Sequence, residues 1–203
     1  MATVRVTREL KHGVRGEIRS MFDKLLTDIR NNIRQHSDSL YEAMIPAEHR
    51  QYMNLLPANY FDVNRESNIY LRAGDYEISV TVMYSEPKRI PKCYSHSAST
   101  RTVDLLDPMN AQLATVLIPL IQEYKAVEGK CKALMDHADT LMENNGTVGM
   151  IVKAWPQFVE VLPSWAKTKH FEVTEKKSRT VTALDDDVVA ELNTSLMVGK
   201  LAG

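Results

Sequence analysis

Residues 76–84 read YEISVTVMY, and this stretch decides which class of fold the sequence predicts. Its apolar side chains alternate with a second, mixed set, which is the period of a strand that buries one face. A turn sequence, RAGD, stands just before it at residues 72–75, and residues 68–71 are again strand-like. We therefore predict an antiparallel hairpin, to which residues 60–63 and 101–106 add further strands.

The regions on either side of this hairpin are predicted to be mostly helical. Residues 8–35 carry apolar side chains at three- and four-residue steps, which places them on one face of a long helix. Thr7 is placed to cap the start of that helix. A second long helix is expected from Asp107, a capping residue followed by proline, to the Asn-Asn-Gly sequence at 144–146. Pro119 predicts a kink or a break inside it.

Shorter elements complete the predicted order. We expect Ser37 or Ser39 to cap a short helix, since serine is a favoured capping residue. Two prolines and a serine-rich run predict a surface loop at residues 86–100. Residues 167–182 are strand-like, and a small helix is expected at residues 185–197.

The predicted fold is α+β, with a long N-terminal helix, a small antiparallel sheet and a C-terminal helical layer. The 203 residues are expected to form one domain, with a helical part at 1–57, a sheet region at 58–106 and a second helical part at 107–203. The most apolar stretch, residues 113–121, is too short to span a bilayer, and residues 1–7 lack the apolar core of a secretory leader. We therefore expect a cytoplasmic location and no membrane partner.

The sequence contains no familiar catalytic motif, such as GxSxG, HExxH, a Walker loop or GxGxxG. Its six histidines are scattered. Neither Cys93 nor Cys131 has a neighbour at metal-ligand spacing, so both thiols are expected to stay reduced. The aspartates at 185–187 are interpreted as a helix cap, because carboxylates complement the start of a helix dipole. We therefore expect no catalytic residue, metal or cofactor, and an enzyme of unrecognised type is only a third hypothesis.

Two groups of basic residues are the candidate nucleic-acid-binding sites. The net charge of the chain is −1, so affinity for phosphate requires a local patch. The first group shares one face of the N-terminal helix and consists of Arg8, Lys11, Arg15 and Arg19. The second lies on the expected loop, beside Tyr94 and His96, and consists of Lys88, Arg89 and Lys92. The alternative interpretation of each group is ordinary solvated charge, which a surface helix carries opposite its apolar face.

The segment after the second long helix resembles part of a known family. Residues 147–163 read TVGMIVKAWPQFVEVLP. The residues that carry the pattern are Thr147, Trp155, Pro156, Leu162 and Pro163, together with the opening residues Val4, Val6, Thr7 and Leu10. This arrangement resembles the nucleotide-modification-associated domain family, fifth type, which is enriched in bacteriophages. The resemblance implies a phage origin and a link to modified DNA.

Two function hypotheses follow, a binding function and a structural or interaction function. The first is a bacteriophage accessory protein of nucleic-acid metabolism or DNA modification, which binds nucleic acid through a local basic face. The alternative is a phage structural or interaction protein, either a virion component or an inhibitor of a host defence factor. Its partners would be a host or phage protein, or further copies of the chain. Trp155 is expected to be buried against the long helix, whereas an exposed tryptophan would indicate an interface.

Overall fold

The computed structural model describes residues 4–97 and 99–174 of the chain. Contacts within the chain divide it into two compact units. Unit 1 is Met1–Leu25 with Val127–Gly203, and unit 2 is Leu26–Ala126. Every contact and cavity described below lies within one of these units.

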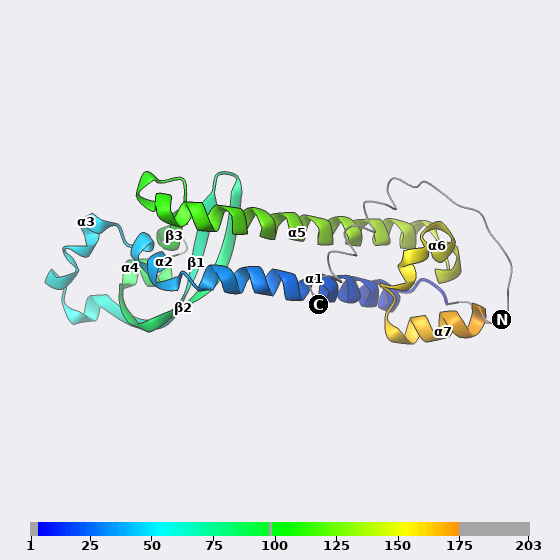
Figure 1. Ribbon diagram of the computed structural model, residues 1–203. Helices are drawn as coiled ribbons and strands as arrows, with labels where there is room; N and C mark the ends of the chain where they lie inside the picture. The colour runs from blue at the N-terminus through cyan, green and yellow to red at the C-terminus, as the bar shows by residue number, and fades with distance from the viewer. Residues whose placement is uncertain (1–3, 98, 175–203) are drawn as a thin grey trace. The chain divides into compact units, whose positions relative to one another are not determined.

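Both long helices that the sequence predicts are present (Figure 1). α1 (Arg8–Arg34) begins after Thr7, whose Oγ1 atom accepts a hydrogen bond from the backbone N–H of Leu10 at 3.2 Å, as a capping residue does. α5 (Ala111–Asn144) runs through Pro119 without a break. The boundary between the units falls inside both helices, and the prediction of a single domain stays a prediction.

Unit 2 contains the sheet, whose strand order is β2-β1-β3 (Figure 1). β1 (Phe61–Ala73) and β2 (Tyr76–Pro91) pair as the predicted antiparallel hairpin. Gly74 in the turn has a φ of 63°, a left-handed conformation that glycine adopts without steric cost. β3 (Thr102–Asp104) pairs parallel to residues 70–72 of β1. The α+β class is confirmed, and the sheet is mixed rather than wholly antiparallel.

The expected surface loop at residues 86–100 is wrong in its first part, because the hairpin continues into it. Residues 61–64 of β1 pair with residues 88–91 of β2 across a shift in register. Pro87 falls within that shift and Pro91 is the last residue of the strand. Sheets tolerate proline at irregularities and at strand ends, so these two prolines do not end the hairpin early.

Unit 2 also contains several short helices. The serines expected to cap the first of them, Ser37 and Ser39, do not do so, because its N-cap residue is His36, whose side chain makes no capping bond. Asp107 does cap its turn as predicted, by accepting from the backbone N–H of Met109 at 2.9 Å. The short elements are α2 (Ser37–Met44), α3 (Ala47–Arg50), η1 (Met53–Leu55), η2 (Ala58–Tyr60), α4 (Lys92–His96), η3 (Ser99–Arg101) and η4 (Pro108–Asn110).

The core of unit 2 is built on the inner face of the hairpin. Four of the five alternating residues from which the hairpin is predicted are buried, namely Ile78, Val80, Val82 and Tyr84 of β2, whereas Tyr76 is 46% exposed. α2 packs on β2 and buries Leu40. Leu117 of α5 is also completely buried, so the face of α5 that carries Leu117 points inward.

Unit 1 combines the first part of α1 with the last part of α5 and three shorter helices. These are α6 (Val148–Ala154), η5 (Pro156–Val159) and α7 (Ser164–Thr174). The strand expected at residues 167–182 is wrong as far as residue 174. The carbonyl of Pro163 accepts from the N–H of Ala166 at 2.9 Å and so begins a helix there. Residues 175–182 and the expected helix at 185–197, with its aspartate cap, lie outside the described residues.

Candidate functional site

The basic row predicted on α1 meets acidic residues of α5 within unit 1. The Arg15 guanidinium donates to the Asp139 carboxylate, with Nε 3.0 Å and Nη2 2.6 Å from Oδ2. Lys11 Nζ lies 3.6 Å from Glu143 Oε1. The hydrogen bond to Asp139, and after it the charge of Asp139, raises the pKa of Arg15 above its ordinary value. Two members of the predicted row therefore already have a counter-charge within the chain.

The other two members of the row, Arg8 and Arg19, are exposed. Neither makes an ion pair with any residue that the structure describes. On one helix their positions are separated by about 16 Å along the axis, at about 1.5 Å per residue. They therefore offer two separate contacts to a phosphate backbone rather than one clustered site.

The second basic group lies on β2 and α4, and two of its members have partners there. Lys88 Nζ is 3.0 Å from Oδ1 of Asp38, and the hydrogen bond between them raises the pKa of Lys88. The Arg89 guanidinium lies 4.3 Å from the ring centroid of Phe61, which is a cation–π contact. The contact of Lys88 thus joins β2 to α2, and that of Arg89 joins β2 to β1. Lys92, the first residue of α4, is exposed.

The residues that carry the family resemblance form a packing joint in unit 1. Trp155 is 2% exposed, and its ring meets the ring of His137 on α5 edge-on, with centroids 4.9 Å apart. The predicted burial of Trp155 against the long helix is confirmed. The other members of the pattern are the buried Leu162 and Pro163, Pro156 at the start of η5, and Thr147, which is the N-cap residue of α6 although its side chain makes no capping bond.

One polar cluster that the sequence does not reveal joins α4 to β1. The Ser95 hydroxyl donates to Oδ2 of Asp62 at 2.6 Å, and His96 Nε2 lies 2.9 Å from the same oxygen. The hydrogen bond from Ser95 is the main cause of a lowered pKa at Asp62. In a nucleophilic site the base contacts the nucleophile itself, but here Ser95 and His96 share one carboxylate oxygen. The cluster is therefore a link between two elements of unit 2.

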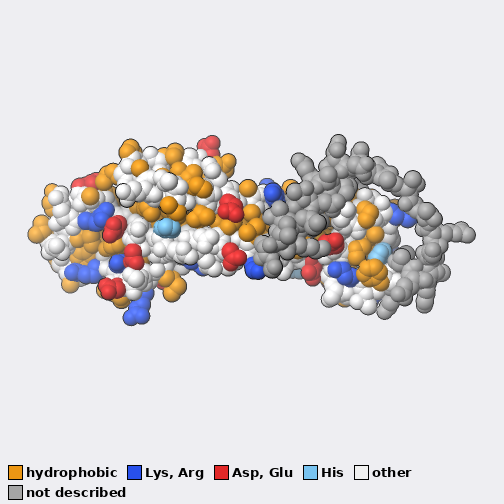
Figure 2. Space-filling model, in the orientation of Figure 1, with side chains coloured by type: hydrophobic (Ala, Val, Ile, Leu, Met, Phe, Trp, Pro, Cys, Tyr) orange, Lys and Arg blue, Asp and Glu red, His pale blue; other side chains and the backbone are white. Residues whose placement is uncertain are grey.

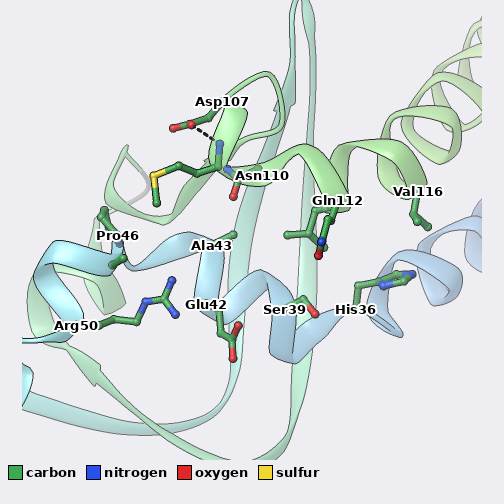
Figure 3. A pocket seen from close by; sticks show the side chains of 13 residues that line it. His36, Ser39, Glu42, Ala43, Pro46, Arg50, Asp107, Asn110, Gln112 and Val116 are labelled. Atoms are coloured by element: carbon green, nitrogen blue, oxygen red, sulfur yellow. Dashed lines mark hydrogen bonds between the residues drawn. The ribbon is translucent and has the colours of Figure 1, made fainter.

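A larger feature of unit 2 is a cleft with a cavity volume of about 400 Å³ (Figure 3). We call it the α2–α5 cleft after its two walls. The first wall, from the end of α1 to α3, supplies His36, Ser39, Glu42, Ala43, Pro46, Ala47 and Arg50. The second wall, from η4 into α5, supplies Asp107, Met109, Asn110, Gln112, Leu113 and Val116. A volume of this size lies within the range of small-ligand sites.

The part of the second wall that follows Asp107 carries no charged side chain over a long distance. Residues 108–122 contain no Asp, Glu, Lys or Arg. Four of them follow one another at steps of four, three and four residues, and we call these residues the α5 ridge: Met109 on η4, and Leu113, Val116 and Leu120 on α5. The ridge lies beside the buried face of α5, and Met109 is 71% and Val116 44% exposed. Figure 2 shows apolar atoms at the surface over unit 2. Such a row is unusual on a solvated helix.

The rim of the cleft carries charges of both signs. Arg50 on the first wall is held in place by its Nε atom, which donates to the carbonyl of Ile45 at 2.8 Å. Glu42 is exposed on the same wall. Asp107 stands on the opposite wall, where its carboxylate accepts from the Met109 N–H, as the dashed line in Figure 3 shows. The cleft is therefore lined by both apolar and uncharged polar side chains, and its rim carries one fixed cation and two carboxylates.

A second apolar surface of unit 2 lies on the segment between α3 and β1. Residues 51–61 read QYMNLLPANYF, again without a charged side chain. None of residues 51–60 is buried. Leu55 is 77% exposed, and Tyr52 and Tyr60 are each more than half exposed. This segment adds apolar area to unit 2 but forms no cavity like that of the α2–α5 cleft.

Comparison with known proteins adds no relative, because no family model, no curated protein and no solved structure matches the chain. The resemblance to the nucleotide-modification-associated family stays a prediction. Within the described ranges 4–97 and 99–174, no three His, Cys, Asp or Glu side chains gather as metal ligands would. No helix in the same ranges has both the length and the apolar composition needed to cross a bilayer.

Proposed function

We propose that the protein works by binding another protein, which it engages through the α2–α5 cleft. The observation that carries this proposal is the exposure of Met109 and Val116 of the α5 ridge, within residues 108–122, which carry no charged side chain. Apolar side chains at helical spacing beside a groove are the surface that recognises an amphipathic helix. A partner that covers this surface would gain about 25 cal/mol of binding free energy for each Å² of apolar area removed from water.

The charges at the rim complement this apolar surface. Arg50 is fixed by its bond to Ile45, so it can pair with a carboxylate of a partner without losing much freedom. Charged groups at the rim of an interface contribute to orientation and to the rate of association more than to affinity. We therefore expect an amphipathic partner whose apolar face fills the cleft and whose polar edge carries an acidic residue opposite Arg50.

Selection of helical peptides on the purified protein tests this function. Peptides selected on the wild type should carry apolar residues at positions i, i+3 or i+4, and i+7. They should lose binding to Val116→Glu, which places a charge on the α5 ridge, and keep binding to Met83→Glu, which adds the same charge to an exposed residue of β2 away from the cleft. Peptides that bind all three proteins alike, or a selection that enriches none, would refute the proposal.

Binding of nucleic acid in support of phage DNA modification, as the family resemblance implies, is a second candidate function. The observation in its favour is that Arg8 and Arg19 are exposed and have no ion pair with the described residues. Two such cations make a weaker site than the four-residue row that the sequence predicts. The salt dependence of binding distinguishes the two cases, because it counts the phosphates that a protein neutralises.

A further inference from the structure

We infer that the partner in the α2–α5 cleft is a second copy of this chain, an inference that rests on the proposed function of the cleft. The α5 ridge and the cleft that it borders belong to the same unit. Two copies related by a two-fold axis can therefore each place their ridge in the cleft of the other. In such an isologous contact one surface patch serves both subunits, and both apolar surfaces become covered together.

The charges around the cleft favour such a self-contact. On a two-fold axis each residue comes close to its own counterpart, so a charged residue there would meet a like charge. Residues 108–122 carry no charge, and the α5 ridge therefore meets itself without repulsion. The first wall carries Arg50 as well as Glu42, and the second wall carries Asp107, so Arg50 is the counter-charge that the first wall offers to Asp107 of a second copy. When the second wall of one copy enters the cleft of the other, its Asp107 comes to the wall that holds Arg50.

The area that a stable dimer needs indicates how far the contact extends. A standard interface buries about 800 Å² on each partner. A single aromatic or large apolar side chain buries at most about 250 Å², and the α5 ridge has only two strongly exposed members, Met109 and Val116. The ridge alone is too small, so the contact includes the wall of α2 and α3. Glu42 on α2 is then placed next to the ridge of the second copy.

Measurements of mass in solution test the inference. Sedimentation equilibrium of the full chain should give a dimer that dissociates on dilution. Val116→Glu should raise the dissociation constant about 100-fold, as expected for a residue near the centre of an interface. Met109→Glu provides a second variant at a residue that is 71% exposed, so loss of the fold does not confound the result. Met83→Glu is the matched control and should leave the dimer unchanged.

A mixed crosslink tests which surfaces meet. In a Cys93→Ser background the remaining cysteine, Cys131, is buried. One protein then carries Val116→Cys and the other Glu42→Cys, so a disulfide between these two positions can form only between copies. Mild oxidation of the mixture should give a disulfide-linked dimer with one of each chain, whereas Met83→Cys mixed with Glu42→Cys should give none.

Three outcomes would overturn the inference. They are a monomer at every concentration, a dimer that Val116→Glu leaves intact, and a mixture in which the crosslink between positions 116 and 42 does not form. Failure here differs from failure of the proposed function. A monomer that still selects helical peptides through the cleft keeps the binding function and assigns the cleft to a different protein.

Discussion

A Cβ atom on Gly13 would stand 2.9 Å from the Cγ atom of Pro163, closer than real Cβ atoms approach a neighbour. Gly13 lies in the first part of α1, where a glycine costs about 1 kcal/mol relative to alanine. Pro163 is buried and its ring has little freedom to move. The absence of a side chain at position 13 is therefore what lets α1 and the Leu162–Pro163 turn pack together.

We expect Gly13→Ala to destabilise the protein by about 1–3 kcal/mol, the usual cost of a methyl group forced into a packed site. Gly16→Ala is the matched control, because nothing lies within 4 Å of a Cβ atom at that position of α1. Its better helix propensity should stabilise the protein by up to about 1 kcal/mol. Urea unfolding followed by circular dichroism measures both changes. Equal stability of the two variants would show that Gly13 and Pro163 are not in contact.

The Arg15–Asp139 pair should show energetic coupling that weakens with salt. Arg15 donates to both carboxylate oxygens of Asp139, and Arg15 is exposed, so mobile ions screen the attraction. A double-mutant cycle with Arg15→Gln and Asp139→Asn measures the coupling. The same cycle with Arg19→Gln in place of Arg15→Gln is the control and should show none. Coupling of equal size in both cycles would mean that the coupling does not come from the contact between Arg15 and Asp139.

The stability of the protein should rise with pH below neutrality because of two histidines. Burial lowers the pKa of His137 and of His170 below the ordinary value of 6.5. In the pH range just below 6.5 the unfolded chain therefore binds more protons than the folded chain, and the free energy of unfolding increases with pH. This contribution is fully present above pH 6.5 and is lost as the pH falls through the folded-state pKa values.

Unfolding measured across that pH range in variants tests the assignment. His137→Phe keeps a ring against Trp155, whose centroid lies 4.9 Å from that of His137, and should reduce the slope. Combining it with His170→Gln should reduce the slope further. The pKa values of Asp38 and Asp62 are lowered from 3.8, so these carboxylates change the stability only at a more acidic pH than the histidines do. A slope that the double variant leaves unchanged would mean that folding does not lower the pKa of either histidine.

The elements that sequence reasoning predicts correctly are those whose pattern is local. The apolar spacing of α1, the alternation from Tyr76 and the Asp107 cap each involve residues a few positions apart. The continuation of β2 to Pro91 was missed because it depends on pairing with residues 61–64, which no local signal shows. The parallel position of β3 likewise depends on where α4 and η3 return the chain. Pro87 and Pro91 predict a loop from local sequence, but these tertiary contacts decide the structure there.

The candidate site was predictable only in part, for the same reason. The carboxylate of Asp139 is 124 residues from Arg15, so spacing on α1 alone cannot show that the basic row is partly neutralised. The α2–α5 cleft needs two walls that are also far apart in the chain. Its one local signal was the uncharged run at residues 108–122, which is too short to span a membrane and indicates an apolar surface instead.

Binding of nucleic acid, if it occurs, should depend on Arg8 and Arg19 and not on Lys11 and Arg15. For a duplex the log–log slope of affinity against salt is about −0.9 for each phosphate neutralised. Two free cations should therefore give a slope of about −2, whereas four would give nearly −4 by the same rule. Fluorescence anisotropy with a labelled duplex at several salt concentrations measures the slope.

Matched pairs of substitutions on α1 distinguish binding through two cations from binding through four. Arg8→Gln with Arg19→Gln should flatten the slope by about two units and weaken binding to all sequences alike. Lys11→Gln with Arg15→Gln removes the same charge but takes it from residues paired with Glu143 and Asp139, so it should lower stability and leave the slope unchanged. A slope near −4 in the wild type would show that Lys11 and Arg15 exchange their carboxylate partners for phosphates. A protein that binds no nucleic acid at low salt would exclude this second function, and the α2–α5 cleft would then carry the function alone.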